Sequence, residues 1–429
     1  MQSLKVSENK RFLCLEDGSP FFWLGDTAWE LFHCLSLEEA EQYFRIRAKQ
    51  GFNVSQIVAL AEFDGLTEPN YYGRFPLLKN ARGQYDPCLW DTKGPNSYWD
   101  HIDAVIDLAE KYEIYVAFVA TWGDKYFKAH GVGPEIFTPE NAREYGRMLG
   151  SRYGHRKNLI WVLGGDRCLS SFDHFKINEE LALGLKSAEK IPHLITCHPA
   201  GEQSSSRYFP AEQWLDFHMI QSGHGRRNLE SYGFVRRDYE LEPVKPVLDG
   251  EPRYEDHPIG FKPENGYFDQ ADVRQAAYWG VFAGGFGVTY GHHSVWKMNR
   301  SFSSYFPLTW EKALERPAAG QMHHLKDLIL QYSFFDRIPC QDLVENNYEG
   351  ANYISATRGR DFALLYAPNG VNIPVKLGVL PGGSVRAKWY SPITGEIRNE
   401  GVCPNHGQRI FEPAHRGRDN DTVLCLESC

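Results

Sequence analysis

The sequence predicts an α/β protein in which a (β/α)8 TIM barrel is followed by a small antiparallel β-sandwich. Two observations lead to this prediction. From about 21 to about 335, eight short apolar, β-branched or aromatic runs alternate with amphipathic stretches. Such alternation is typical of a parallel sheet, and eight units are typical of a closed barrel. From about 339 onward, apolar and polar residues alternate at period two between glycine-containing turns, which indicates antiparallel strands.

The first strand of the barrel is expected at 21–29, where FFWLGDTAW passes from apolar to polar residues. A helix is expected next, over 36–51. Ser36 can serve as its N-cap, and Glu39, three residues later, completes a capping box. A second apolar run, FNVSQIVAL over 52–60, predicts the second strand.

The same pattern continues to the end of the barrel. A helix over 97–112 would place Trp99, Ile102, Val105, Ile106 and Ala109 on one face. A helical stretch is expected after every strand, and the pattern is weakest after the fifth. The remaining strands are expected at 114–122, 158–166, 194–200, 216–223, 246–252 and 287–293. The remaining helices are expected at 139–154, 174–189, 230–239, 270–283 and 318–332.

The second domain is recognised by its turns. The segments YISATRGRDFALLYAPNG, PVKLGVLPGGSVRAKWYSPITGEI and DTVLCLES alternate at period two, with PNG, PGG and ITG between apolar runs. These features predict a catalytic barrel over 1–337 and a β-sandwich over 338–429.

Charge excludes some classes of partner. The 429 residues carry 46 Lys and Arg against 55 Asp and Glu, a net charge of −9. A nucleic-acid binder has a basic surplus, and an anionic membrane surface also attracts basic proteins, so neither partner is expected. No apolar run approaches the ~18 residues of a membrane-spanning helix. Aromatic residues make up 14% of the chain, which fits stacking against sugar rings and also fits a large core.

The cysteines and the N-terminal segment indicate the cellular compartment in which the protein is expected. Nine cysteines are dispersed along the chain without a CxxC pair, which is typical of free thiols in a reducing compartment. The first residues lack a basic start followed by an apolar stretch and a small-residue cleavage site. We therefore expect a cytoplasmic protein. The number of subunits stays open.

Polar and aromatic side chains follow the ends of most predicted strands. Because the carboxyl ends of barrel strands meet at one mouth, we expect these side chains to converge there. We also expect the long loops 62–96 and 199–213 to shape the site. The candidates are Asp26, Trp29, Glu62, Trp122, Asp166, His198, His218, His224, Glu251, His292 and Trp296.

Asp166 and Glu251 form the pair that matters most for chemistry. They follow the fourth and seventh strands, which face each other across an eight-stranded barrel. Glycosidic cleavage requires one protonated carboxyl group for the leaving oxygen and one ionised carboxylate for the anomeric carbon. In retaining enzymes the two groups lie ~5–5.5 Å apart. The alternative is that each carboxylate merely pairs with its neighbour, Arg167 or Arg253.

The other candidates would bind substrate. Trp29, Trp122 and Trp296 could stack against a sugar, or could simply pack in the core. Asp26, Glu62 and the histidines could hydrogen-bond to hydroxyl groups, or could be structural. A metal site built from His218, His292, His293 and Asp26 is the remaining alternative. Barrel metallohydrolases usually carry HxH on the first strand, where this chain has GDTAW. We therefore expect neither a metal nor an organic cofactor.

Three motifs carry a family resemblance. GDTAW, WVLGGD and PVLDGEPRYE lie at the ends of the first, fourth and seventh predicted strands, and WYSPITGE lies in the second domain. Together they resemble the bacterial apiosidase family, glycoside hydrolase family 140, over nearly the whole chain. The resemblance implies a retaining barrel followed by a small sandwich once labelled as collagen-binding. It also implies that Asp166 is the acid/base and Glu251 the nucleophile. Related retaining barrels usually carry Asn-Glu where this chain has Gly165-Asp166.

The expected function is a retaining, exo-acting glycoside hydrolase with a carbohydrate substrate. By the resemblance, the sugar released is a terminal furanose such as apiose, from pectic side chains or other plant glycosides. Arabinofuranosides, galactofuranosides and β-glucans are alternative substrates, because a fold does not fix its substrate. A non-catalytic sugar-binding protein on a hydrolase scaffold and a barrel metallohydrolase are alternatives of other classes.

Overall fold

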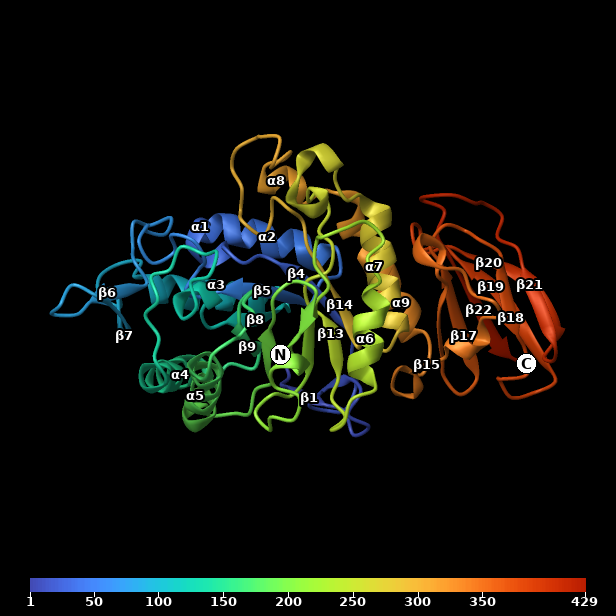
Figure 1. The fold of residues 1–429 in the computed structure, drawn as a ribbon, viewed down its shortest axis with the longest axis horizontal. Helices are drawn as coiled ribbons and strands as arrows, with labels where there is room; N and C mark the ends of the chain where they lie inside the picture. The colour runs from blue at the N-terminus through green and yellow to red at the C-terminus, as the bar shows by residue number, and fades with distance from the viewer.

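The computed structural model describes residues 1–429 and confirms the predicted barrel and the antiparallel domain that follows it (Figure 1). Six barrel strands are hydrogen-bonded in the order β10-β9-β8-β5-β4-β14, and β12 pairs with β13 in parallel. Main-chain bonds from Asp216 N to Ile195 O (2.8 Å) and from Phe286 N to Val247 O (3.1 Å) close the ring. The eight strands are β4 (Trp23–Thr27), β5 (Val54–Val58), β8 (Tyr115–Val119), β9 (Leu159–Gly164), β10 (Ile195–His198), β12 (His218–Gln221), β13 (Val247–Asp249) and β14 (Gly287–Tyr290).

Seven helices occur where the sequence predicts them. Ser36 caps the first of them, accepting from Glu39 N while the Glu39 side chain accepts from Ser36 N, which is the predicted capping box. Thr138 and Asp269 cap two others in the same reciprocal way. The helices are α2 (Leu37–Lys49), α3 (Tyr98–Lys111), α4 (Pro139–Tyr153), α5 (Phe172–Ala188), α6 (Ser231–Tyr239), α7 (Gln270–Phe282) and α9 (Pro317–Leu330).

The helix expected after the fifth strand is absent, so that prediction is wrong. Between β10 and β12 the chain forms the short strand β11 (Gln203–Ser204) and one 3-10 turn, η2 (Ser205–Arg207). The segment PAGEQSSSRYFP contains prolines at both ends and three serines, which compete for backbone hydrogen bonds and leave no apolar face. Ser204 and Ser206 donate instead to the buried Asp238 of α6.

Several smaller elements were not predicted. The N-terminus forms an antiparallel sheet of β1 (Leu4–Val6), β2 (Leu13–Leu15) and β3 (Pro20–Phe21). The loop after β5 contains a hairpin of β6 (Leu77–Lys79) and β7 (Tyr85–Trp90), seen at the left of Figure 1. Two four-residue helices lie at loops of the mouth: α1 (Leu31–Cys34) and α8 (Trp310–Ala313).

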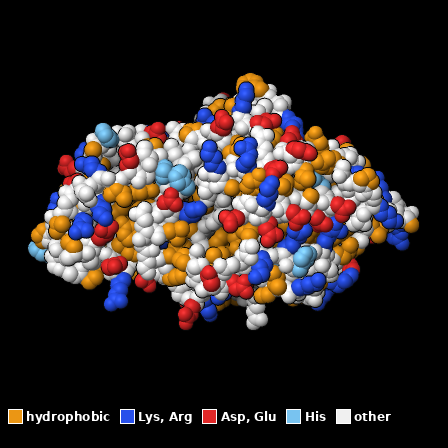
Figure 2. Space-filling view, turned by 180° about the vertical axis from the view of Figure 1, so that it is seen from behind, with side chains coloured by type: hydrophobic (Ala, Val, Ile, Leu, Met, Phe, Trp, Pro, Cys, Tyr) orange, Lys and Arg blue, Asp and Glu red, His pale blue; other side chains and the backbone are white.

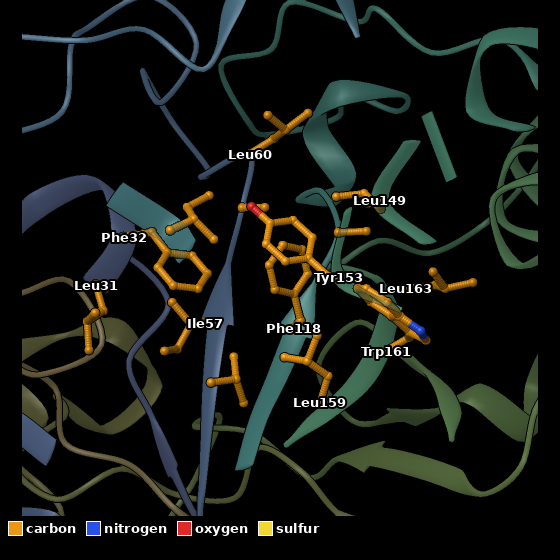
Figure 3. Close-up of a cluster of buried hydrophobic side chains, with 14 of the residues drawn as sticks. Leu31, Phe32, Ile57, Leu60, Phe118, Leu149, Tyr153, Leu159, Trp161 and Leu163 are labelled. Atoms are coloured by element: carbon orange, nitrogen blue, oxygen red, sulfur yellow. The ribbon is translucent and has the colours of Figure 1, made fainter. Parts of the chain in front are cut away.

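Alternate residues of each barrel strand serve two hydrophobic layers. On β9, Trp161 and Leu163 face outward and pack with Phe118 of β8 and Tyr153 of α4, as Figure 3 shows. Ile160 and Val162, which alternate with them along the strand, belong to the inner layer. The period-two pattern therefore separates the barrel interior from the layer beneath the helices.

The second domain consists of eight strands. Six form an antiparallel sheet in the order β15-β16-β17-β22-β19-β20, and β18 pairs with β21. Their inward side chains form a core of their own, which includes Leu365, Trp389 and Phe411. The strands are β15 (Ile338–Pro339), β16 (Ser355–Arg358), β17 (Phe362–Ala367), β18 (Ile373–Lys376), β19 (Ser384–Tyr390), β20 (Ile397–Pro404), β21 (Gln408–Phe411) and β22 (Thr422–Ser428).

Helix α7 lies between the two domains (Figure 1). All of its residues after Gln270 are buried, so no polar face is left for solvent. The ring of Tyr278 stacks on Tyr366 of β17, with centroids 4.6 Å apart. Arg274 has a fully buried side chain and lies 2.6 Å from the carboxylate of Asp421, which is itself 1% exposed. The two domains thus share one continuous interface through this helix.

The surface agrees with the charge balance of the sequence. Acidic and basic side chains are interspersed over the face drawn in Figure 2, and no basic stripe crosses it. No helix combines the length and the apolar character needed to cross a membrane. All nine cysteines are free thiols.

Candidate active site

A pocket of about 560 Å³ opens at the carboxyl ends of the barrel strands. Asp166 and Glu251 both line it, although 85 residues separate them in the chain. The loops after β5 and β10 contribute to its wall, as the sequence predicts. Other lining residues are Trp29, Glu62, Phe63, Trp122, His130, Arg167, Glu202, Gln221, His224, Tyr254, His257, Phe261, Trp296 and Tyr305.

Glu251 follows β13 and lies between two histidines. The Nε2 atom of His198, at the end of β10, is 2.8 Å from Oε2, and the Nε2 atom of His224 is 3.0 Å from Oε1. The carboxylate is 8% exposed. Burial by itself would raise its pKa, but the hydrogen bond from His224 and the close imidazole of His198 outweigh burial and lower the pKa of Glu251 to about 2. Glu251 is therefore ionised at neutral pH.

Asp166 is presented by an unusual stretch of backbone. Gly164, Gly165 and Asp166 all have positive φ, at 86°, 111° and 55°. A Cβ atom on Gly164 would lie 2.2 Å from His198 O, and one on Gly165 would lie 2.6 Å from Gly123 N. Only glycine fits these two positions. The left-handed turn directs Asp166 into the pocket, and strained backbone of this kind is found most often at functional sites.

Asp166 is more exposed than Glu251 and is loosely held. Its side chain is 32% exposed, with the imidazole of His130 at 3.7 Å and the guanidinium of Arg167 at 3.9 Å. Arg167 donates mainly to main-chain oxygens, at 2.8 Å to Phe127 and at 2.7 Å to Asp166 itself. Arg253 forms no ion pair with Glu251, and its nearest opposite charges are those of Asp272 and Asp249. Glu251 is therefore not paired with its neighbouring arginine, and Asp166 makes only a long contact with Arg167.

Aromatic rings form the floor of the pocket. Trp29 and Trp122 lie with ring centroids 5.3 Å apart, and both contact the ring of His198, at 5.2 and 5.6 Å. The Nε1–H of Trp122 is buried and has no partner in the protein. Tyr254 adds a third ring, 4.3 Å from that of His224. This floor offers stacking faces together with two polar groups that have no partner in the protein, Trp122 Nε1–H and the Tyr254 hydroxyl, which suits a small polyhydroxylated ring.

A second group of carboxyl groups lies beside the catalytic candidates. Burial and the negative charges of Glu30, Asp166 and their neighbours raise the pKa of Glu62 well above its ordinary value. Burial likewise raises the pKa of Glu30 to about 8. The raised pKa favours the protonated form of Glu62, in which the carboxyl group has an O–H donor.

The arrangement fits the chemistry of glycoside cleavage. A buried, ionised carboxylate and a partly exposed carboxyl group line one small pocket above aromatic rings. A sequence profile described as "Apiosidase-like, catalytic domain" matches residues 7–336.

The chain belongs to the apiosidase-like family.

A second profile, "Putative collagen-binding domain of a collagenase", matches residues 338–427 of this apiosidase-like protein. Among solved structures, a glycoside hydrolase family 5 protein from Bacteroides vulgatus ATCC 8482 is 33% identical, with a TM-score of 0.90 over 99% of this chain and 94% of that one. Another glycoside hydrolase is also 33% identical, with a TM-score of 0.88 over 100% of this chain and 97% of that one.

More distant likeness is confined to the fold. The endo-1,4-beta-mannanase from Rhizomucor miehei is 14% identical, with a TM-score of 0.52 over 76% of this chain and 99% of that one. A comparison with curated protein sequences gives no match. The apiosidase-like protein is thus a glycoside hydrolase by family, as the motifs of the sequence predict.

The structure places most of the predicted site residues of the apiosidase-like protein together. Seven line the pocket, and His198 lies directly below it, against Glu251. Those that line the pocket are Trp29, Glu62, Trp122, Asp166, His224, Glu251 and Trp296.

Three predictions of substrate-binding residues are wrong, each for a different reason. Asp26 points outward from β4 toward α2, where its carboxylate lies 2.6 Å from Arg47 Nε. His218 begins β12, so it lies at the amino end of the strand, opposite the mouth. His292 is held by the loop that follows Glu251, with Nε2 3.0 Å from Asp256 Oδ2. None of the three lines the pocket.

Sequence reasoning also missed part of the site. Tyr254 and His257 follow Glu251 in the loop after β13, and His130 approaches Asp166 from the loop after β8. An aromatic residue three positions after the predicted nucleophile is a signal for Tyr254. The others lie in irregular loops, where no periodicity shows the direction of a side chain.

Proposed function

We propose that this protein is a retaining, exo-acting glycoside hydrolase that releases a terminal furanose, with apiose as the first candidate. The observation that carries the proposal is the environment of Glu251. A hydrogen bond from His224 and the nearby imidazole of His198 keep this buried carboxylate ionised in a pocket that it shares with the partly exposed Asp166. A nucleophile must be ionised to attack, and an acid must reach the leaving oxygen, so the two environments suit two different roles.

In the first step, a carboxylate oxygen of Glu251 attacks the anomeric carbon. The bond to the leaving oxygen breaks, and Asp166 transfers its proton to that oxygen. In the second step, Asp166 removes a proton from a water molecule, whose oxygen attacks the anomeric carbon and frees Glu251. His198 and His224 hold the nucleophile in place during both steps, and Trp29 and Trp122 support the sugar.

Pocket size and family membership support a small terminal sugar. The space of about 560 Å³ must accommodate both the terminal residue and part of the leaving group. The motifs GDTAW and WVLGGD end in Trp29 and Asp166, which line the pocket, and their resemblance to apiosidases is the basis for choosing apiose. Arabinofuranosides and galactofuranosides are the furanosides to compare.

The test is release of free sugar from a panel of apiosides, arabinofuranosides, galactofuranosides and β-glucans by the wild type, Glu251→Gln and Asp166→Asn. We expect apiose release, lowered by at least ~10³-fold in Glu251→Gln, because the amide cannot form the glycosyl ester. The loss of activity in Asp166→Asn should be smallest on substrates with an activated leaving group, because such a group departs without a proton. NMR of the first product should give the anomeric configuration of the substrate.

Glu202→Gln is the matched control, because Glu202 lines the rim and is 45% exposed. It should retain activity. Release of another sugar that is lost in both catalytic variants would keep the mechanism and correct the substrate. Binding of sugars without release of any would instead support the non-catalytic alternative.

A further inference from the structure

The pocket has two tiers of aromatic rings that differ in depth. Trp29, Trp122 and Tyr254 at the floor are only 2%, 3% and 2% exposed. Phe63 and Phe261, which line the same pocket, are 38% and 58% exposed. In a pocket that cleaves terminal sugars, the deep tier holds the sugar that is released. The shallow tier then faces the part of the substrate that leaves.

The rings of the shallow tier are linked through buried histidines. The ring centroids of Phe63 and Trp296 lie 6.2 Å apart, and those of Phe261 and the buried His257 lie 4.9 Å apart. Beneath the pocket surface, the fully buried His293 joins Trp296 at 6.4 Å and His257 at 4.4 Å. Burial lowers the pKa of both His257 and His293, which favours their neutral forms, and Lys297 places a cation 4.9 Å from the ring centroid of Phe63. We call these five rings the aromatic arc.

The two exposed ends of the arc are strained. Phe63 has φ = 50° and Phe261 has φ = 64°, a region that bulky side chains rarely adopt. Each is fixed by its surroundings. The buried Lys125 donates to Phe63 O at 3.0 Å, and Phe261 N donates to Pro258 O at 3.0 Å. Strain that the fold maintains in order to expose an apolar ring beside the catalytic pocket indicates a binding role.

We propose that the aromatic arc is the leaving-group subsite, in which Phe63 and Phe261 bind the apolar face of a ring attached to the released sugar. This inference rests on the proposed function and specifies its substrate class: glycosides whose leaving group is a pyranose or a phenol. A leaving group without a ring, such as methanol, makes no use of the arc.

The test compares Phe63→Ala and Phe261→Ala with the wild type on three apiosides that share the terminal sugar. Their leaving groups are methanol, phenol and glucose. For each substrate, kcat/KM of the variant is divided by that of the wild type, which cancels the intrinsic reactivity of the leaving group. We expect a fall of about three- to tenfold for the ring-bearing substrates and none for the methyl glycoside. A fall for only one of the phenyl and glucosyl substrates would tell which ring the arc binds.

Phe302→Ala is the control, because Phe302 is 79% exposed in the loop that follows Trp296 and does not line the pocket. It should change none of the three ratios. Equal losses on all three substrates, or no loss on any, would overturn the proposal. Glycine variants of Phe63 and Phe261 should unfold at the same temperature as the wild type or higher, because glycine adopts positive φ freely. A marked fall would indicate a structural role instead.

Binding provides a readout that does not depend on turnover. Titration of Glu251→Gln protein with the same three compounds should give tighter binding of the two ring-bearing ones, and Phe63→Ala in that background should remove the difference. Binding without any hydrolysis by the wild type would reject the proposed function but retain the subsite. Equal affinity for all three compounds would reject the subsite alone.

Discussion

At the scale of single residues, Glu251 shows how neighbours can reverse the effect of burial. A carboxylate that is 8% exposed would ordinarily hold its proton near neutral pH. Here His224, in the loop after β12, hydrogen-bonds to one carboxylate oxygen, and the imidazole of His198, at the end of β10, lies 2.8 Å from the other. The pKa falls from the ordinary value of 4.5 to about 2 instead of rising. His198 and His224 are therefore positioning residues that act through the carboxylate.

Replacing His224 by Leu should create a pH dependence that the wild type lacks. Without one N–H donor, burial dominates and the pKa of Glu251 rises to its ordinary value or above. Since only the ionised form attacks, kcat/KM should fall by ~10-fold or more between pH 6 and pH 4. In the wild type, Glu251 stays ionised throughout that range. The measurement is kcat/KM from pH 4 to pH 8.

His224→Gln provides the control, because an amide N–H can replace the imidazole donor. Its acid limb should lie close to that of the wild type. An unchanged profile in His224→Leu would show that the histidines do not control the ionisation of the nucleophile.

The sequence located these residues only in part, because it identifies a strand more easily than the direction of its side chains. Asp26 is expected in the pocket because it lies near the end of β4, but its side chain points toward Arg47 on the helix side of the strand. The strand that contains His218 is predicted correctly, but His218 lies at its amino end and not at the end that meets the pocket. Alternation along the strand specifies two faces, and only tertiary contacts decide which one meets the pocket.

At the scale of elements, the end of β9 is the most demanding segment. Three successive residues have positive φ, and a Cβ atom on Gly164 or Gly165 would lie within 3 Å of the backbone of His198 or Gly123. The motif WVLGGD could be recognised from the sequence, but the reason for its glycines needs these close approaches. They allow a short Asp side chain to reach into the pocket.

Gly165→Ala should therefore impair both folding and catalysis. Its Cβ atom would lie 2.6 Å from Gly123 N, and φ = 111° is itself unfavourable for alanine. We expect a loss of about 1–3 kcal/mol of stability and a fall of ~10²-fold in kcat/KM as Asp166 shifts. Chemical denaturation and steady-state kinetics measure the two effects.

Gly83→Ala is the control that separates the effect of a steric clash from the effect of a positive φ on alanine. Gly83 has φ = 75° but no heavy atom within 4 Å of the position of a Cβ atom, and it lies in the hairpin of β6 and β7. It should lose stability only, with kcat/KM unchanged. Full activity in Gly165→Ala would refute the role given to the turn.

Regular elements were the most predictable part of the fold. All eight barrel strands and seven helices follow from apolar runs, helical periodicity and caps such as Ser36. The helix expected after β10 failed because the barrel pattern was extended over a segment with no apolar face. The hairpin of β6 and β7 is not predicted because its strands are only three and six residues long and β7 contains a proline, which argues against a strand.

At the scale of the whole molecule, the ion pair of Arg274 with Asp421 joins the two domains. Arg274→Ala would leave Asp421, 1% exposed, without its partner. We expect a loss of about 3–5 kcal/mol of unfolding free energy, because a buried charge is uncompensated. Asp421→Asn in the same chain should recover part of that loss. Equilibrium denaturation of the single and double variants checks this.

A surface ion pair is the comparison. Arg300 lies 2.6 Å from Glu39, but its side chain is 44% exposed. Arg300→Ala should cost less than about 1 kcal/mol. Equal losses for the two arginines would contradict the importance of the buried interface.

The burial of α7 on all sides has a consequence for how such proteins can be recombined. One side of α7 packs against the barrel and the other side packs against the sandwich. A substitution on either side therefore affects both domains. The second domain is therefore not an independently exchangeable unit, and transferring it to another hydrolase would also require the matching helix. Chimeras that cut the chain at the domain junction should fail to fold, whereas those that carry α7 together with the sandwich retain its complementary surface.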